Sequence, residues 1–228
     1  MTRQTYRESL APPPGADVLV DIWSDDLLAK LMGYVWQAYD ELYRTTWSKV
    51  SWTEEYSDVE RSLSEDLERT LREQMRRDSF LSITVQHAPS EREARSKTKA
   101  NAQPPQYDIA FQWHDPRIMW PLEAKVLKSD KNTQANLKDY IQTLQDRYLT
   151  CYYAPFSNGG AMIGYLKTGD AEEVIQHIAN RLSTPLAPHP TFTNRCHKTS
   201  DHQRVVPPGK DYPVHFRCHH LILPLTKY

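Results

Sequence analysis

YDIAFQWHDPRIMWPLEAKVL, residues 107–127, contains two short apolar runs separated by a proline-containing turn. The runs are residues 107–113 and 118–127, and their aromatic and aliphatic composition predicts two adjacent β-strands. Asp108 opens the first strand, and Glu123 and Lys125 lie within the second. Because side chains two residues apart on a strand point to the same face, Glu123 and Lys125 should share one side of the sheet. The stretch therefore predicts a largely buried strand pair that carries two acids and one lysine.

Hydrophobic periodicity on either side predicts further helices and strands. Val59, Leu63, Leu67, Leu71 and Met75 recur at helical spacing, which predicts a helix over about 57–77. The other expected elements are helices at 24–47, 133–149 and 170–182, and strands at 80–89, 151–156, 161–167 and 214–225. Asn158, Gly159 and Gly160 are expected to form a hairpin turn, and 183–213 a loop. This order predicts an α/β fold with a mixed central sheet flanked by helices.

A length of 228 residues fits one domain with extensions. We expect an N-terminal extension and helix over 1–50, a core over 51–183, and a loop-rich C-terminal extension over 184–228 that ends in a strand. No apolar run is long enough to cross a bilayer, and the N-terminal segment lacks the apolar region of a secretory signal. Three cysteines do not make a disulfide framework, so a cytoplasmic protein without membrane contact is expected.

Asp108, Glu123 and a neighbouring backbone carbonyl offer the hard oxygen ligands that suit Mg²⁺. Such a metal acidifies a bound water and takes up charge on a phosphoryl oxygen, while Lys125 orients or helps to deprotonate the water. At about 100° per residue, Glu60 falls at the centre of the buried face of its helix, whereas Glu65 points away from it. Glu60 is therefore the candidate third acid.

The motif Tyr107-Asp108 with Glu123-Ala124-Lys125 resembles that of the PD-(D/E)XK nuclease superfamily, with tyrosine in place of the usual proline. The resemblance covers about 59–182 and implies a restriction-endonuclease-like core in which a helix, three strands, a helix and a strand follow one another. It implies a Mg²⁺-dependent nuclease, with Mn²⁺ as a substitute, whose catalytic residues are Glu60, Asp108, Glu123 and Lys125. The three acids would hold the metal.

Two further segments, 160–165 and 219–223, look like parts of restriction-endonuclease-type proteins found in bacterial defence systems. That likeness implies DNA as the substrate and a role in prokaryotic anti-phage defence or restriction, with other protein subunits as possible partners. With 28 Lys and Arg against 29 Asp and Glu, the chain has no global basic field, so DNA would need a local groove. The candidate nucleic-acid contacts are Lys128, Lys131, Gln142, Arg195 and Lys198.

Two alternatives stay open at this point. Glu123 and Lys125 can form a simple ion pair on a strand face, and the chain can be an inactive binding or adaptor module that recruits a partner to nucleic acid. The C-terminal cysteines and histidines offer zinc-ligand types, but their spacing is irregular and His219 and His220 should face opposite ways. We therefore expect packed side chains and no zinc. The cluster consists of Cys196, His197, His202, Cys218, His219 and His220.

Overall fold

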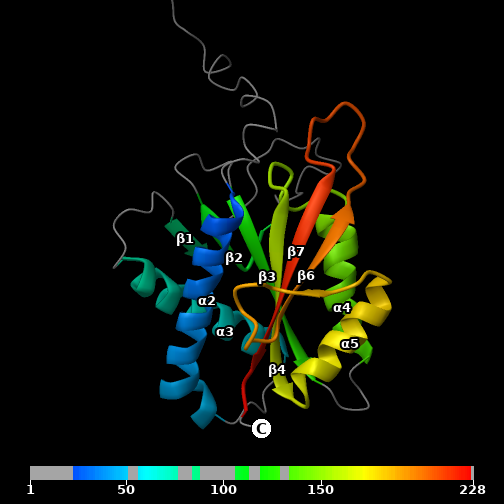
Figure 1. Cartoon of the computed structure of the whole chain (residues 1–228). Coiled ribbons are helices and arrows are strands. Elements are labelled where there is room, and N and C mark those ends of the chain that lie inside the picture. The colour runs from blue at the N-terminus through cyan, green and yellow to red at the C-terminus, as the bar shows by residue number, and fades with distance from the viewer. Residues whose placement is uncertain are drawn as a thin grey trace, which may run out of the picture.

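Figure 1 shows a mixed β-sheet between two layers of helices. The computed structural model describes residues 23–50, 56–76, 84–87, 106–112, 119–128 and 134–226. Within these ranges one sheet contains seven strands in the order β1-β2-β3-β4-β7-β6-β5. The strands are β1 (Thr84–His87), β2 (Ile109–Gln112), β3 (Met119–Lys128), β4 (Gly159–Thr168), β5 (Ala187–Pro188), β6 (His197–Gln203) and β7 (His215–Pro224). The α/β class and the mixed sheet predicted from the sequence are confirmed.

Helices cover both faces of the sheet. One face packs against α2 (Asp25–Thr45) and α3 (Tyr56–Arg76), and the other against α4 (Gln134–Thr143) and α5 (Ala171–Leu182). A 3-10 turn, η2 (Trp47–Lys49), follows α2, and a π-helical turn, η3 (Leu144–Tyr148), continues α4. Side chains cap two of the helix starts: Ser24 accepts from the backbone N–H of Leu27 and Asp170 from that of Glu173. The four expected helices are therefore present close to their predicted bounds.

The apolar stripe of α3 is buried as its periodicity predicts. Val59, Leu63, Leu67, Leu71 and Met75 are all less than a tenth exposed and join the core beneath α2. Burying such a stripe removes apolar surface from water, and this is the main stabilising effect on an amphipathic helix. The phase of α3 relative to the sheet is therefore set, and with it the direction of every polar side chain on the helix.

The direction of the strands changes across the sheet. β1, β2 and β3 pair antiparallel, β4 runs parallel to both of its neighbours β3 and β7, and β7, β6 and β5 again pair antiparallel. A parallel pair needs a crossover connection, which α4 and η3 supply between β3 and β4. β3 and β4 therefore lie in the interior, with cores on both of their faces.

The predicted hairpin around residue 158 is wrong. Residues 151–156 form no strand, because Cys151 and Ala154 have positive φ values of 58° and 49°. Gly159 and Gly160 lie inside β4 instead of in a turn. A Cβ on Gly160 would stand 2.8 Å from the Tyr148 ring and 3.1 Å from the carbonyl oxygen of Pro121, so close packing accounts for this glycine.

The C-terminal region is also more regular than predicted. The expected loop over 183–213 contains the short strand β5 and the seven-residue strand β6, while the final strand is confirmed as β7. β1 lies within the strand expected at 80–89, and the rest of that expected strand falls outside the described residues. No described helix has both the length and the hydropathy needed to span a bilayer.

Candidate active site

The four residues singled out from the sequence meet where β3 extends beyond its neighbour β2. The two strands pair only from Ile109 opposite Leu122 to Gln112 opposite Met119, so the edge of β3 after Leu122 has no β2 partner. Two carboxylates accept hydrogen bonds from the backbone of β3 along that edge. Asp108 Oδ2 accepts a hydrogen bond from the backbone N–H of Ala124 at 2.8 Å, and Glu60 Oε2 accepts one from that of Val126 at 3.2 Å.

The ammonium group of Lys125 lies between these carboxylates. Lys125 Nζ donates to the Ala124 carbonyl at 2.6 Å, to Glu60 Oε1 at 2.9 Å and to Glu123 Oε1 at 3.4 Å. Glu123 and Lys125 share one face of β3, as the alternation of a strand requires, while Ala124 is fully buried in the core on the other face. The structure therefore brings Glu60, Asp108, Glu123 and Lys125 into one cluster.

One oxygen of this cluster has no hydrogen-bond partner among the described residues. Glu123 is 8% exposed, its Oε1 faces Lys125, and its Oε2 is buried without a donor. A buried carboxylate oxygen that gains nothing in exchange for its hydration destabilises the folded state. This oxygen can therefore give a lone pair to a cation or accept a hydrogen bond from a ligand.

The cluster also holds more negative than positive charge. Glu60, Asp108 and Glu123 offer three carboxylates against the single ammonium of Lys125. Burial, together with the nearby Asp108, raises the pKa of Glu123 well above its usual range, and burial also raises the pKa of Glu60. Burial alone would lower the pKa of Lys125, but Glu123, Glu60 and Asp108 together raise it above normal. Lys125 therefore stays protonated, but its single positive charge does not balance the three carboxylates around it.

The helix phase predicted for α3 is confirmed at its acidic positions. Glu60 reaches the cluster from the same helix face as the buried leucines, whereas Glu65 is exposed. Glu68, which lies at the margin of that face, is 7% exposed and pairs with Arg72 one turn later. Sequence periodicity was sufficient to separate the acid of the cluster from the acids of the helix surface.

A cleft of about 440 Å³ opens beside Lys125. Gln142 lines it from α4 and donates to Asp146 at 3.0 Å, so this predicted nucleic-acid contact lies next to the cluster. Arg147 and Tyr152 also line the cleft, with the guanidinium 4.8 Å from the centre of the tyrosine ring. Neither was predicted as a site residue. Arg147 lies within the π-helical turn and Tyr152 just after it, where the regular helical spacing no longer shows which side chains face the cleft.

The other predicted nucleic-acid contacts do not join the cluster. Arg195 donates to Asp40 on α2 at 2.8 Å and lies over the Trp36 ring, and Lys198 on β6 lies 3.7 Å from Glu172 on α5. β6 is separated from β3 by β4 and β7, so these two cations belong to another part of the molecule. Lys128 ends β3, and Lys131 falls outside the described residues.

Three histidines form a second polar cluster near β6. Among the described residues, one possible metal-ligand atom from each of His189, His197 and His219 lies within 4.8 Å of the other two. Trp36 Nε1 donates to His197 Nδ1 at 3.2 Å, and His197 Nε2 lies 3.0 Å from His219 Nδ1. Burial lowers the pKa of His197 to about 2 and that of His219 to about 3, so both rings are neutral. Neutral imidazoles form hydrogen bonds with one another here, and the neutral ring is also the form that binds a metal ion.

The expected divergence of the adjacent histidines is confirmed. His219 contacts Trp120 and His197 on the face that packs against α2, whereas His220 bonds to Tyr140 of α4 at 2.9 Å and to Ser200 at 2.8 Å. The two rings cannot share one ion.

Comparison of the chain with protein-family models, with curated proteins and with solved structures finds no match.

Proposed function

We propose that the chain is a metal-dependent nuclease of the PD-(D/E)XK type. The observation that carries the proposal is the cluster at the free edge of β3, where three carboxylates surround one lysine and Glu123 Oε2 is buried without a partner. A divalent cation would supply the missing positive charge and the missing partner together. Structural ion pairs usually balance their charges, so an excess of buried carboxylate favours a ligand site over a stabilising contact.

The arrangement of the elements supports the same proposal. α3, β1, β2, β3, α4 and β4 follow one another as a helix, three strands, a helix and a strand, with β3 and β4 parallel. Tyr107, which occupies the usual proline position, is buried and accepts a hydrogen bond from the backbone N–H of Ala154 at 2.9 Å. Tyr107 therefore packs in the core, while the next residue, Asp108, still reaches the cluster.

The donor set fits a hard cation. Asp108, Glu123 and the Ala124 carbonyl would hold Mg²⁺, with Glu60 as the third acid at the edge of the site. All are oxygen ligands, which Mg²⁺ and Mn²⁺ prefer over nitrogen or sulfur. When bound, the metal would acidify a water molecule and neutralise charge on a phosphoryl oxygen.

Lys125 serves as a hydrogen-bond donor in this proposal. Because the surrounding carboxylates raise its pKa, the side chain stays an ammonium group at neutral pH and cannot abstract a proton. Glu60 holds Nζ at 2.9 Å and so fixes its direction. A positioned ammonium orients the attacking water and stabilises charge that develops on the phosphate.

The substrate proposed is DNA, in keeping with the defence or restriction setting that the family resemblance implies. The cleft beside Lys125 would admit one strand, with Gln142 and Arg147 on its wall. Asp139 and Asp146 line the same cleft and offset the charges of Lys125 and Arg147. Few phosphates would therefore be neutralised there, and DNA affinity should depend only weakly on salt concentration.

The test combines cleavage with metal binding. Linear, nicked and supercoiled DNA are incubated with the protein in Mg²⁺, Mn²⁺ or EDTA, and Mn²⁺ binding is measured by calorimetry. We expect cleavage only with a divalent metal, and loss of both cleavage and Mn²⁺ binding in Glu123→Gln but not in Glu65→Gln. Cleavage in EDTA, or equal Mn²⁺ binding by Glu123→Gln and the wild type, would refute the proposal.

A second candidate is an inactive module that binds nucleic acid and recruits a partner. The observation that favours it is that Lys125 Nζ already has three protein acceptors, as in a closed ion-pair cluster. The same calorimetry separates the two functions. A module predicts DNA binding without Mn²⁺ binding, and a nuclease predicts that Mn²⁺ enters the cluster.

A further inference from the structure

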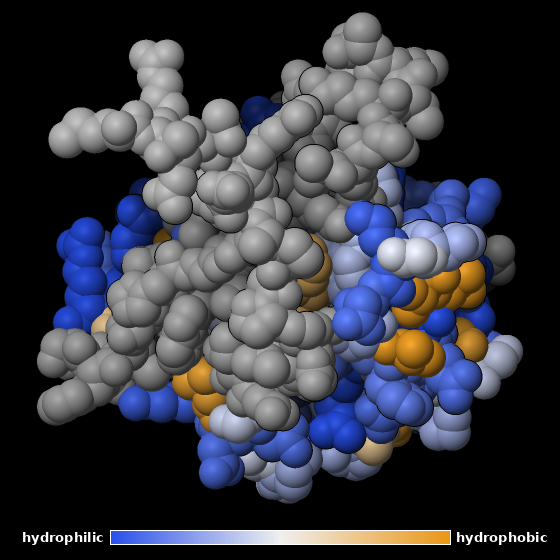
Figure 2. Space-filling model, turned by 90° about the horizontal axis from the view of Figure 1, so that it is seen from above, coloured by the Kyte–Doolittle hydropathy of each residue, from blue (hydrophilic) through white to orange (hydrophobic). Residues whose placement is uncertain are grey.

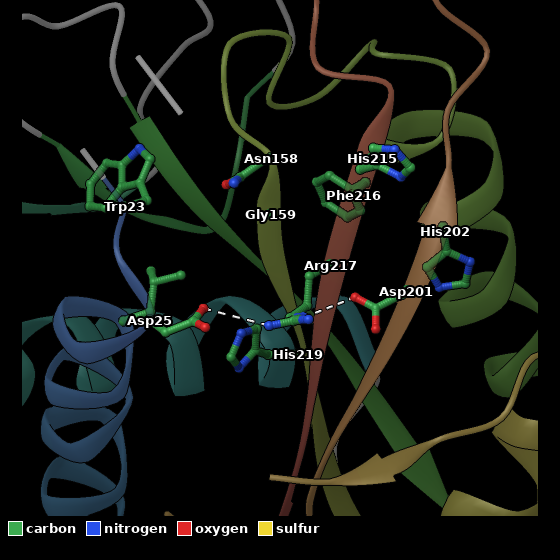
Figure 3. A pocket seen from close by; sticks show the side chains of 11 residues that line it. Trp23, Asp25, Asn158, Gly159, Asp201, His202, His215, Phe216, Arg217 and His219 are labelled. Carbon is green, nitrogen blue, oxygen red and sulfur yellow. Dashed lines mark hydrogen bonds and ion pairs between the residues drawn. The ribbon is translucent and has the colours of Figure 1, made fainter. Parts of the chain in front are cut away.

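A second pocket lies apart from the cleft beside Lys125. Its volume is about 350 Å³, near the lower end of the range for small-molecule sites, and it shares no lining residue with that cleft. Its walls come from the start of α2, the start of β4 and the facing ends of β6 and β7, as Figure 3 shows. Seen from above in Figure 2, the described surface is mainly hydrophilic, with hydrophobic residues only in small groups.

The charged residues of this pocket are held in fixed positions. Arg217 lies between two carboxylates, 3.5 Å from Asp25 Oδ1 and 2.8 Å from Asp201 Oδ1, which Figure 3 marks with dashed lines. Two carboxylates therefore face one guanidinium. A phosphate or carboxylate ligand would meet an excess of like charge, so the pocket favours an uncharged ligand.

Two buried indole donors near the pocket have no acceptor among the described residues. Trp23 lines the pocket and is 3% exposed, and its Nε1 lacks a partner. Figure 3 shows the nitrogen on the side of the ring that faces Asn158. Trp120, also without a partner at Nε1, lies behind Gly159, where a Cβ would stand 3.2 Å from that nitrogen. Buried indole N–H groups usually find an acceptor. Of the two tryptophans, Trp23 lines the pocket, so its N–H can donate to a ligand there.

A second donor to the pocket follows from the histidine chain. An indole N–H can only donate, so Trp36 fixes His197 Nδ1 as an acceptor and places the His197 proton on Nε2. His197 then donates to His219 Nδ1, which leaves the His219 proton on Nε2. His219 lines the pocket, and burial lowers its pKa to about 3, so it is an uncharged donor there.

We propose that this pocket binds an uncharged planar ring that carries carbonyl acceptors, the chemistry of a nucleobase. Trp23 and His219 would donate to ring carbonyls, and Asp25 and Asp201 would accept from ring N–H groups. His215, which is exposed, adds a ring face for stacking. The choice of a nucleobase over another cyclic amide depends on the proposed nuclease function, and the base can come from a free nucleoside or from a strand.

The experiment measures binding in EDTA, so that it does not depend on cleavage or on the metal cluster. The wild-type protein is titrated by calorimetry with uridine, cytidine, guanosine, adenosine, ribose and inorganic phosphate. We expect saturable binding of at least one carbonyl-bearing nucleoside and weaker binding of adenosine, which has no carbonyl. Ribose and phosphate should not bind.

Variants tie the binding to the pocket. Trp23→Phe keeps the ring but removes the N–H, so affinity for the bound nucleoside should fall about tenfold. Trp47→Phe is the control, because Trp47 Nε1 donates to Asp66 outside the pocket at 3.4 Å. The melting temperature of each variant checks folding. A trinucleotide that displaces the nucleoside identifies a strand as the source, whereas one that does not identifies a free nucleoside.

The proposal would be overturned if no nucleoside binds in the low millimolar range or if phosphate binds as tightly as nucleosides. It would also be overturned if Trp23→Phe binds the nucleoside with the affinity of the wild type. Because the titration contains no metal, these outcomes are independent of whether Glu123 binds Mn²⁺ and whether DNA is cleaved.

Discussion

Glu60 Oε1 accepts a hydrogen bond from Lys125 Nζ at 2.9 Å although the two residues are 65 positions apart in the sequence. The second oxygen of Glu60 accepts from the backbone N–H of Val126 at 3.2 Å. One side chain of α3 therefore fixes both the ammonium group and the strand edge beside it. In the proposed nuclease, Glu60 would position Lys125 in addition to its expected place among the metal ligands.

Replacing Glu60 tests this relationship. Glu60→Gln keeps an oxygen for Val126 but loses the charge that holds Lys125, so turnover should fall by about tenfold or more and Mn²⁺ affinity should weaken. The melting temperature should stay close to that of the wild type, because Glu60 is partly exposed. Glu65→Gln, on the exposed face of the same helix, is the matched control for cleavage kinetics and calorimetry. A larger effect of Glu65→Gln would mean that the helix phase is misassigned.

Removal of the lysine separates catalysis from binding. Lys125→Ala deletes a donor to the developing charge, so turnover should drop on the order of 10²–10³-fold while DNA affinity changes little. Removing one member of a buried ion pair can destabilise a protein by roughly 3–5 kcal/mol, so the thermal midpoint is measured beside the rate. A well-folded Lys125→Ala protein with wild-type turnover would exclude the proposed role of the lysine.

The buried acid predicts a pH effect on stability. The pKa of Glu123 is raised in the folded state above its ordinary value of 4.5, so the folded state binds the proton more tightly than the unfolded chain does. The contribution of Glu123 to the free energy of unfolding is complete below pH 4.5 and is lost as the pH rises through the raised pKa. In EDTA, Glu123→Gln should therefore be more stable than the wild type at alkaline pH and lose that advantage in acid. Chemical denaturation at several pH values measures the difference.

Mn²⁺ supplies the control for that series. A bound cation should restore stability to the wild type at alkaline pH and leave Glu123→Gln unchanged. If the wild type and Glu123→Gln have parallel stability profiles in EDTA, the raised pKa of Glu123 is contradicted.

Residue types and local periodicity were enough to predict which side chains come together in the cluster. Asp108 and Glu123 were placed by the alternation of two apolar strands, and Glu60 by the phase of a leucine stripe. These signals act over a few residues, so they are visible in the sequence. The contact of Lys125 with Glu60, and the cleft with Arg147 and Tyr152, depend on how distant elements pack.

β6 was missed for a related reason. Its buried residues include His197 and Ser200, which are polar, so the strand has no apolar alternation. Their hydrogen bonds go to Trp36 on α2 and to His220 on β7, partners that a local pattern cannot reveal. The segment 151–156 shows the opposite error, because its aromatic composition favours a strand while Cys151 takes a left-handed backbone conformation.

Two glycines should respond in opposite ways to alanine. A Cβ on Gly160 would stand 2.8 Å from the Tyr148 ring, so Gly160→Ala should destabilise the protein by about 1–3 kcal/mol. Gly33 lies within α2, and a Cβ there meets nothing within 4 Å, so Gly33→Ala should stabilise by about 0.5–1 kcal/mol. Urea unfolding measures both changes. Equal effects of the two substitutions would contradict the strand position assigned to Gly160.

The histidine cluster gives a prediction about zinc. His197 accepts from Trp36 at Nδ1 and donates from Nε2 to His219, so neither nitrogen keeps a lone pair for a metal. Protein prepared without added metal should contain no zinc by elemental analysis, and EDTA should not lower its melting temperature. Trp36→Phe removes the donor that fixes the His197 tautomer, so this variant should take up added zinc more readily than the wild type. Stoichiometric zinc in the wild-type protein would show that the three imidazoles are arranged as metal ligands and not as a hydrogen-bonded chain. Zinc uptake unaltered by Trp36→Phe would contradict the tautomer assigned to His197.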